Sequence, residues 1–348
     1  MSARAHIVPV FVPHLGCRHD CVFCNQRQIA GQTEAAGPED VTAALAPLRA
    51  EPPRQRELAF YGGSFTAVEP QQRRALLQAA QPWLQEGVIQ SIRVSTRPDA
   101  VDASVLAELR AFGVTTVELG AQSMDEAVLR ASGRGHTAED TRRASALVKD
   151  AGLHLVLQMM TGLPGATEES DMETAHALAK LKPSGTRIYP TVVLRGTALY
   201  ALWQRGAYQA QSVEEAAALC ARMIPVFEDA GVAVLRVGLN PSPTLEAAVA
   251  AGPYHPAFGE LVRARMWRAR AAALLEAMPT QGRAATVYVH PSRISQMTGQ
   301  KKENLTALCR QFGLTSVRVC AAACAPDALR VTCSAPAGIQ ATGQQGES

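Results

Sequence analysis

The chain has 348 residues, 47% of them hydrophobic, and a formal net charge of +3. That is enough to bury one large α/β core and a small additional segment. No secretory leader pattern opens the sequence, and no apolar run approaches the ~20 residues that a membrane span needs. The eight cysteines are clustered rather than spread along the chain. These features argue against a secreted disulfide scaffold or a membrane protein, and predict a cytoplasmic protein with reduced thiols and no membrane partner.

Short β-branched runs alternate with longer Ala- and Leu-rich runs over the first two thirds of the sequence. The predicted strands are Ile7–Val12, Glu57–Tyr61, Ile92–Ser95, Thr116–Leu119, Leu153–Met160, Arg187–Tyr189 and Val232–Val237. The predicted helices are Pro70–Glu86, Asp102–Phe112, Thr137–Ala151, Glu168–Leu181 and Ser212–Ala230. This alternation predicts βα units around a parallel sheet, and therefore a full or partial (β/α) barrel. Chemistry in such barrels lies at the C-terminal ends of the strands.

The composition changes near residue 240, where Asn240–Pro243 suggests a linker. We predict a barrel domain at residues 1–240, a small C-terminal α+β extension at 241–333 and a disordered tail at 334–348. The predicted elements of the extension are helices Gly259–Met278 and Glu303–Phe312 and strands Thr286–Val289 and Thr315–Val319. The first helix carries four arginines that do not share one face, which favours a solvated helix over an RNA contact.

Three cysteines, Cys17, Cys21 and Cys24, follow the first predicted strand. An iron–sulfur cubane is normally held by four cysteines, so three thiolates leave one iron open for a small molecule. The alternative is structural zinc, which needs four closed ligands; His14 or His19 could supply the fourth. The cysteines alone leave both readings open.

The spacing C-x3-C-x2-C, with Phe23 before the third cysteine, resembles the cluster loop of the radical S-adenosylmethionine (SAM) enzymes. The resemblance implies an enzyme whose [4Fe–4S] cluster is held by these three cysteines, with Phe23 beside the cofactor. In that superfamily SAM chelates the open iron, and an electron from a reductant such as flavodoxin or ferredoxin cleaves SAM to a 5′-deoxyadenosyl radical.

A pair of glycines, Gly62 and Gly63, follows the second predicted strand and precedes Ser64. A sharp turn alone would explain two glycines, because they adopt positive φ without strain. One βα unit after the cysteines, however, the segment resembles the radical-SAM glycine motif, whose backbone receives the methionyl amine of SAM. Ser64 stands where many members have an acidic residue, so one polar contact to that amine is in question.

The third, fourth and fifth strands also end in polar segments that resemble this superfamily, in the branch of oxygen-independent coproporphyrinogen oxidase and the Elongator catalytic subunit. The resemblance implies that Ser95 and Gln158 lie near the ribose and Gln122 near the nucleoside. It also implies that Arg134 pairs with the methionyl carboxylate. Arginine suits that role, since its planar fork meets a carboxylate in two places and keeps its charge.

A narrower resemblance is to the radical-SAM domain of the Elongator catalytic subunit, over roughly residues 5–240. It rests on the segments Ser95–Pro164, Arg187–Thr191 and Arg195–Trp203, which occur in the right order. Arg187 replaces the usual lysine, and the first gap between cluster cysteines is shorter than in that family. The resemblance implies an Elongator-like tRNA modification enzyme, with transfer RNA as the candidate substrate. Tyr189, at the barrel mouth, is the catalytic candidate that would contact substrate or relay a hydrogen atom.

The residues after 240 contain no Gly-rich pyrophosphate loop of the expected kind, and no strongly basic extension precedes the first strand. We therefore predict an Elongator-like enzyme without the acetyltransferase domain or its acetyl-CoA. A tetrapyrrole-modifying enzyme or a haem-binding carrier, like relatives of coproporphyrinogen oxidase, is the alternative. The remaining cysteines Cys309, Cys320, Cys324 and Cys333 leave open a second metal site or, as the simpler reading, unpaired small hydrophobes.

Overall fold

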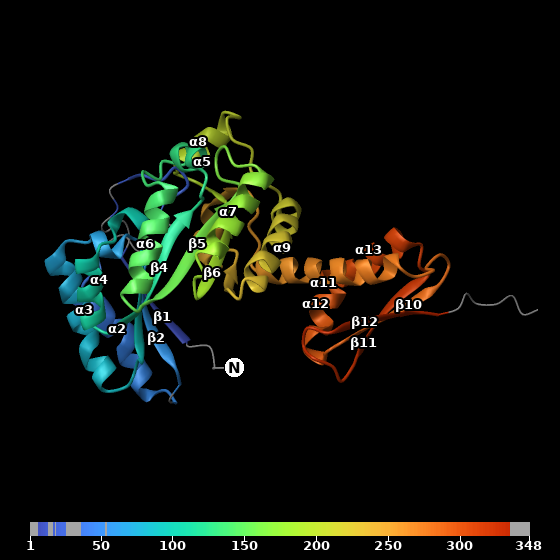
Figure 1. The fold of residues 1–348 in the computed structure, drawn as a ribbon, viewed down its shortest axis with the longest axis horizontal. Helices are drawn as coiled ribbons and strands as arrows, with labels where there is room; N and C mark the ends of the chain where they lie inside the picture. Colours follow the sequence, from blue (N-terminus) through green and yellow to red (C-terminus); the bar gives the residue numbers. More distant parts are fainter. Residues whose placement is uncertain (1–5, 13–16, 18, 26–35, 53, 335–348) are drawn as a thin grey trace, which may run out of the picture. The chain divides into compact units, whose positions relative to one another are not determined.

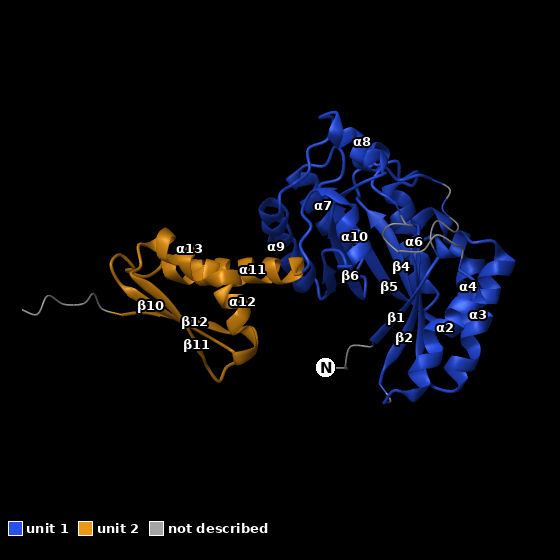
Figure 2. Ribbon diagram, turned by 180° about the vertical axis from the view of Figure 1, so that it is seen from behind, with its two compact units in different colours: residues 1–256 blue, residues 257–348 orange. Residues whose placement is uncertain are grey.

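The structure, a computed structural model, describes residues 6–12, 17, 19–25, 36–52 and 54–334. It divides into two compact units, residues 1–256 and 257–348 (Figure 2). Among the described residues, no helix combines the length and the apolar character that crossing a membrane would require.

The first unit is built on a seven-stranded parallel sheet that curls into a partial barrel (Figure 1). Its strands, in spatial order, are β1 (His6–Phe11), β2 (Arg56–Tyr61), β3 (Ser91–Thr96), β4 (Val114–Gln122), β5 (His154–Thr161), β6 (Gly185–Pro190) and β8 (Ala233–Val237). Each coincides with a predicted strand, so the predicted (β/α) architecture is confirmed. The largest difference is β4, which continues to Gln122.

Most of the helices of this unit cover the outer face of the sheet, whereas α8 (Ala198–Gln204) and α10 (Pro243–Ala248) lie at the C-terminal ends of its strands (Figure 1). The other helices are α2 (Pro38–Leu45), α3 (Pro70–Gln85), α4 (Ala103–Ala111), α5 (Glu126–Ala131), α6 (Ala138–Asp150), α7 (Glu168–Lys180) and α9 (Val213–Asp229). The five predicted helices are present, and their starts are capped: Asp102 accepts from the backbone N–H of Val105 at 2.9 Å, and Thr137 and Asp140 form a capping box.

The two faces of the sheet differ in polarity because side chains alternate along each strand. The outer face is apolar and fully buried under the helices, as Leu58, Phe60 and Leu157 illustrate. The inner face instead carries charged residues such as Arg93 and Glu118. The core of the unit therefore lies between sheet and helices, and the inner face is free to build a polar site.

The segment after residue 240 still packs with the first unit. Strand β9 (Val249–Ala251) pairs with β7 (Val193–Leu194), and Leu245 packs with Val192 and Leu194. The compact unit therefore extends to Pro256. The predicted domain boundary at residue 240 stays a prediction, and it falls before a segment that belongs to this packing.

The second unit is a small α+β structure. It contains α11 (Phe258–Glu276), β10 (Ala284–Val289), α12 (Ile294–Thr298), α13 (Glu303–Phe312), β11 (Ser316–Ala321) and β12 (Leu329–Cys333). Its sheet has the order β11-β10-β12, with β11 parallel and β12 antiparallel to β10. Trp267, Leu275, Val287, Met297 and Leu308 form its core. Apart from Ser334, the predicted tail 334–348 lies outside the described residues.

Candidate active site

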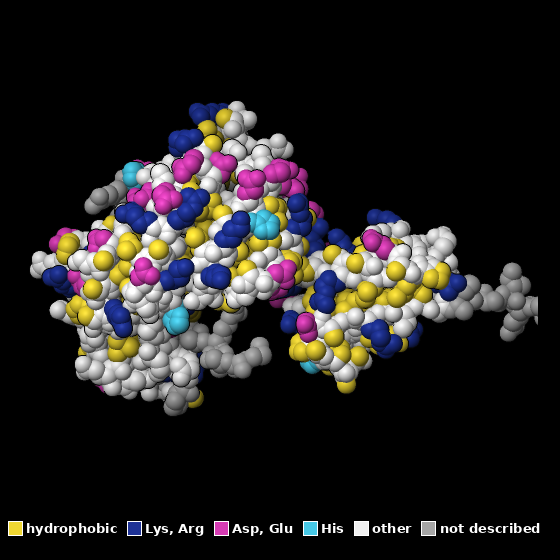
Figure 3. Space-filling view, in the orientation of Figure 1, with side chains coloured by type: hydrophobic (Ala, Val, Ile, Leu, Met, Phe, Trp, Pro, Cys, Tyr) yellow, Lys and Arg dark blue, Asp and Glu magenta, His cyan; other side chains and the backbone are white. Residues whose placement is uncertain are grey.

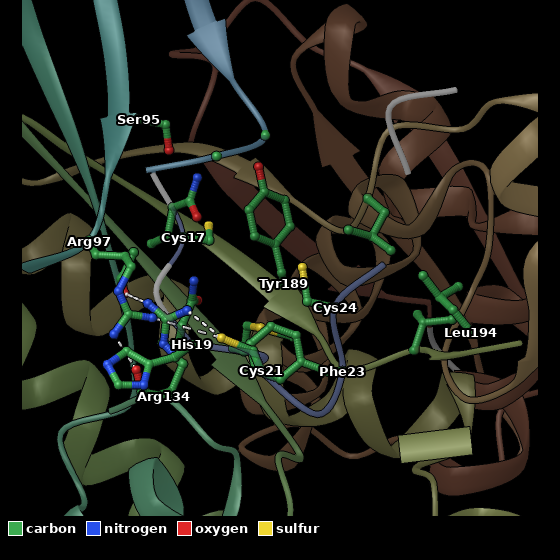
Figure 4. A pocket seen from close by; sticks show the side chains of 18 of the residues that line it. Cys17, His19, Cys21, Phe23, Cys24, Ser95, Arg97, Arg134, Tyr189 and Leu194 are labelled. Atoms are coloured by element: carbon green, nitrogen blue, oxygen red, sulfur yellow. Dashed lines mark hydrogen bonds between the residues drawn. The ribbon is translucent and has the colours of Figure 1, made fainter. Parts of the chain in front are cut away.

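A cavity of about 290 Å³ lies at the C-terminal ends of the barrel strands (Figure 4). Side chains and backbone from the cluster loop and from strands β2 to β6 line it. The predicted site residues that it brings together are Cys17, Cys21, Phe23, Cys24, Gly62, Gly63, Ser95, Gln122, Arg134, Gln158 and Tyr189. Ser64 is the exception among the predicted set.

Ser64 is fully buried behind the cavity wall. Its hydroxyl lies 2.9 Å from the Thr96 hydroxyl and accepts a hydrogen bond from the backbone N–H of Arg97 at 3.3 Å. The side chain therefore joins the end of β3 to the glycine turn. Gly62 has φ +101°, a conformation that favours glycine, which explains its place at the start of that turn.

The cluster loop is fixed to the barrel through its backbone at Val22. The Val22 N–H donates to the Ser132 carbonyl at 3.1 Å, and the Val22 carbonyl accepts from the Leu199 N–H at 2.7 Å. Leu199 sits in the first turn of α8, whose N-cap is Thr197. The start of the segment Arg195–Trp203 therefore has a structural role, because Thr197 caps the helix that holds the cluster loop.

Two glycines let the cluster loop approach the barrel closely. Gly133 and Gly135 both have positive φ, +65° and +70°. A Cβ at Gly133 would lie 3.1 Å from the Asp20 carbonyl, and one at Gly135 would lie 2.6 Å from the His19 ring. A Cβ at Gly133 would press on the backbone of the cluster loop, and one at Gly135 would require the His19 ring to move, so both glycines suit the close packing of this loop on the barrel.

Two buried arginines lie beside Cys21. An Nη of Arg134 is 3.2 Å from the Cys21 sulfur, and its other Nη donates to the Gly120 carbonyl at 2.6 Å. An Nη of Arg97 lies 4.0 Å from the same sulfur and its fork binds Asp99. The second Nη of Arg97 also donates to the Arg134 carbonyl. Arg97 was not predicted as a site residue, although the Arg-Pro-Asp segment after β3 was the signal available.

The pKa of the Cys17 thiol is raised overall, and the two arginines only partly oppose that shift. Desolvation and the nearby Cys21 raise the pKa of the Cys17 thiol, while Arg97 and Arg134 act in the opposite direction. An anionic ligand set would therefore gain stabilisation from both guanidinium groups, which are 5% exposed each.

The end of β4 is distorted where it meets the cavity. Gln122 has φ +65°, and the pairing of β4 with β5 shifts register between Gly120 and Gln122. His136 lies against this bulge, with its Nε2 3.2 Å from the Ala121 carbonyl. Burial first, and then Arg134 and Arg97, lower the pKa of His136 to about 3, so the ring is neutral near pH 7. Strain of this kind commonly marks a functional position.

A line of buried charges crosses the inner face of the sheet beneath the cavity. Glu118, which is 0% exposed, lies 3.0 Å from Arg187 on β6 and 3.4 Å from Arg93 on β3. Arg93 continues the line to Glu57 on β2 at 2.8 Å. Gln158 also donates a hydrogen bond to Glu118. The carboxylate that forms the ion pairs therefore also orients the Gln158 amide.

Tyr189 stands above this line and faces the cavity near Cys24 (Figure 4). Burial raises the pKa of its phenol, although Arg187 opposes the shift. Arg187 also donates to the Tyr61 hydroxyl at 3.0 Å. Tyr189 is therefore a neutral phenol near pH 7, held beside a cation that is itself fixed by Glu118.

The cavity fits a SAM-binding cluster by the chemistry of its donors. Three thiol-bearing residues line one wall, and buried polar atoms on the wall lack a protein partner, namely Arg134 Nε and Gln122 Oε1. A ligand that offers both an acceptor and a donor would satisfy these two atoms. In the described part of the chain, no three Cys, His, Asp or Glu side chains converge on a single metal ion. A cubane does not require such convergence, because each thiolate binds a different iron. His14, the other zinc candidate besides His19, lies outside the described residues.

Comparison with known proteins supports the interpretation of this cavity as a site for a cluster and SAM. The model of the radical SAM superfamily matches residues 11–178, and the radical SAM C-terminal domain model matches residues 183–268. The chain therefore belongs to the radical SAM superfamily. It is an enzyme of this class, and the class binds a [4Fe–4S] cluster and SAM.

Within the superfamily the chain is similar to Elongator proteins. It is 35% identical to human Elongator complex protein 3 over 179 residues, which are 50% of this chain and 32% of that protein. It is 38% identical over 126 residues to the tRNA uridine(34) acetyltransferase of Methanocaldococcus jannaschii, covering 35% of this chain and 23% of the relative. The solved Methanocaldococcus infernus Elp3 with an N-terminal deletion superimposes with a TM-score of 0.62 and 25% identity, over 76% of this chain and 63% of that chain.

The match thus spans less than half of these curated relatives. The predicted likeness to the radical-SAM domain of the Elongator catalytic subunit is confirmed, as are the predicted cofactors.

Proposed function

We propose that this enzyme uses its cluster and SAM to generate a 5′-deoxyadenosyl radical and to modify transfer RNA. The observation that carries the proposal is the convergence of the three cysteines, Arg134 and the polar strand ends on one cavity. The similarity to Elongator complex protein 3 and to a tRNA uridine(34) acetyltransferase supports transfer RNA as the substrate class.

One set of residues would hold the cluster and the methionyl end of SAM. Cys17, Cys21 and Cys24 would hold the cluster, with Arg97 and Arg134 stabilising its negative charge. Arg134 is also suited to the methionyl carboxylate, because its buried Nε still lacks a partner. When bound, the cluster supplies the electron that cleaves the sulfonium of SAM.

The remaining wall would orient the nucleoside part of SAM and the substrate. Gly62 and Gly63 have no side chains, so SAM could approach their backbone closely, and Phe23 adds an apolar surface. Ser95, Gln122 and Gln158 offer hydroxyl and amide groups for a ribose and a base. Tyr189 would present a neutral hydroxyl to the substrate or relay a hydrogen atom. Apolar residues such as Leu194 would help to exclude water from the reaction.

Two further predictions accompany the proposal. An electron donor such as flavodoxin or ferredoxin would supply the cluster, and the enzyme would act in the cytoplasm. Both follow from the resemblance to radical SAM enzymes and from the composition of the chain.

The test is product formation with and without RNA. Anaerobically reconstituted full chain, dithionite and SAM should yield 5′-deoxyadenosine, and digestion of added bulk transfer RNA should give a nucleoside of new mass. The matched control is the Cys17→Ala, Cys21→Ala, Cys24→Ala variant, which should form neither product.

Formation of 5′-deoxyadenosine with unchanged RNA, together with consumption of an added porphyrinogen, would overturn the RNA proposal in favour of tetrapyrrole chemistry. Absence of SAM cleavage together with retention of haem on the purified protein would instead indicate a carrier.

A further inference from the structure

The two units carry opposite net charge. Residues 257–348 hold 11 Lys and Arg against 5 Asp and Glu, whereas residues 1–256 hold 23 against 26. A small unit with such an excess of cations attracts polyanions. Figure 3 shows Lys and Arg side chains distributed over the surface of this unit, with few acidic ones on the visible face.

In the described part of the second unit, all three helices pack on the same face of the sheet. Its core residues Val287, Val331 and Leu329 all point to the same side, where α11, α12 and α13 pack. By strand alternation, the opposite face consists of Ala284, Thr286, Tyr288, Ser316, Arg318, Cys320, Arg330 and Thr332. We call this set the open sheet face. It contains two arginines and no acidic residue.

An aromatic and a cation stand together at its centre. Tyr288 lies on the middle strand β10, directly opposite Arg330 on β12 and Cys320 on β11. The Arg330 guanidinium lies 4.0 Å from the centre of the Tyr288 ring. Arg318 on β11 is exposed and pairs across with Thr286, next to Tyr288 on the same face.

We propose that the open sheet face binds a single-stranded segment of RNA. This inference rests on the proposed function, because it assigns a second contact surface for the same RNA substrate. The Arg330 guanidinium, held over the Tyr288 ring, would stack a base on its outer side, Arg318 and the charge of Arg330 would attract the phosphates, and the hydroxyls of Thr286 and Thr332 would contact ribose. The charge and the flat aromatic centre together fit a single strand, whose bases are free to stack.

Binding is tested on the full chain with a fluorescent ten-nucleotide RNA at several salt concentrations. The Arg318→Gln, Arg330→Gln double variant should bind roughly tenfold more weakly at low salt. Its plot of log affinity against log salt should be shallower by roughly 0.7 for each lost phosphate contact. The matched control is Arg310→Gln, an exposed arginine on α13 at the other side of the sheet, which should leave both quantities near wild type.

The stacking part is tested separately at Tyr288. Tyr288→Leu should weaken binding by roughly tenfold with little change in salt dependence, and Tyr288→Phe should restore it, since the ring remains. Circular dichroism and the thermal midpoint of each variant show whether the unit still folds. Equal binding by folded Tyr288→Leu, Tyr288→Phe and wild-type protein would overturn the assignment of this face.

The outcomes also separate this inference from the proposed function. Formation of 5′-deoxyadenosine without RNA should be unchanged in every variant, because none of these residues lines the active-site cavity. RNA binding by wild type that no variant on the open sheet face weakens would overturn this inference alone. Absence of RNA binding by wild type would overturn the choice of RNA as substrate as well. Variants that change only the oligomeric state would show instead that the face joins two copies of the chain.

Discussion

The two units of this chain use their charges in different ways. In the first unit, arginines such as Arg97, Arg134 and Arg187 are buried, hold defined partners and surround a cavity. In the second unit, Arg318 and Arg330 are exposed on an open sheet. Buried charge requires fixed geometry, and exposed charge favours long-range attraction. The difference agrees with chemistry in the first unit and with the RNA contact proposed for the second.

Removal of the three cluster thiols should have the largest effect, because it should abolish the chemistry of the first unit and leave RNA binding by the second unit in place. The Cys17→Ala, Cys21→Ala, Cys24→Ala variant should contain no iron or sulfide and cleave no SAM, because no thiolate is left to bind iron. Its affinity for RNA should stay within about twofold of wild type if the second unit supplies most of the binding. Iron analysis and RNA titration on the same preparation check both statements. Retained cleavage would contradict the account of the first unit.

Substitution of Arg134 should weaken SAM binding while leaving the cluster in place. We expect Arg134→Gln to bind SAM roughly 10- to 100-fold more weakly, since a charged partner of the carboxylate is lost from a buried site. The matched control is Arg130→Gln, an exposed arginine on α5, which should bind SAM like wild type. Equilibrium binding of SAM and the iron content of both variants provide the measurement. Equal affinities would remove Arg134 from the SAM site.

Neutralising Glu118 should destabilise the first unit. Glu118 lies between Arg93 and Arg187 and is fully buried, so Glu118→Gln leaves two cations without their shared carboxylate. The expected loss is about 3 kcal/mol of unfolding free energy, as for other broken buried pairs. The control Glu139→Gln removes an exposed partner of Arg142 and should cost less than about 0.5 kcal/mol. Urea unfolding compares the two, and similar losses would refute a structural role for the buried line.

The last effect depends on pH. Burial first raises the pKa of Asp171 on α7 to about 7, against the hydrogen bond that its carboxylate accepts from the Gly162 N–H at 2.8 Å. The native state therefore binds a proton more tightly than the unfolded state does. The contribution of this group is full below about pH 4, and it is lost as the pH rises toward 7.

Asp171→Asn should remove this dependence. At pH 8 the variant should be more stable than wild type by roughly 4 kcal/mol, because the pKa rises from 3.8 to about 7 and each pKa unit corresponds to about 1.36 kcal/mol, and near pH 4 the two should be similar. Urea unfolding at both pH values measures this, with the exposed Glu173→Gln on the same helix as control. Parallel pH profiles for wild type and Asp171→Asn would contradict the assignment.

The sequence predicted the parts of the fold that local pattern determines. All seven strands of the barrel sheet were predicted because each is a short β-branched or apolar run between helices. Short helices such as α5 and the last strand β12 were not predicted, because a few residues carry too little periodicity. The cysteines and glycines were found because their spacing is itself a signal.

The features of the site that the sequence did not predict depend on contacts between residues far apart in the chain. Glu118 was seen only as part of a strand end, since its partners Arg93 and Arg187 lie on strands far apart in sequence. Arg97 comes within 4.0 Å of the Cys21 sulfur only in the folded barrel, since the two lie 76 positions apart in the chain. Ser64 was expected beside the cofactor, but its side chain turns into the wall and bonds Thr96.

The most direct test of the central claim is electron paramagnetic resonance of the anaerobically reconstituted and reduced full chain, before and after addition of SAM. The account predicts the signal of a reduced [4Fe–4S] cluster, from about four irons per chain, that changes when SAM binds the open iron. A preparation that holds zinc in place of iron, or a cluster signal that SAM leaves unchanged, would contradict it.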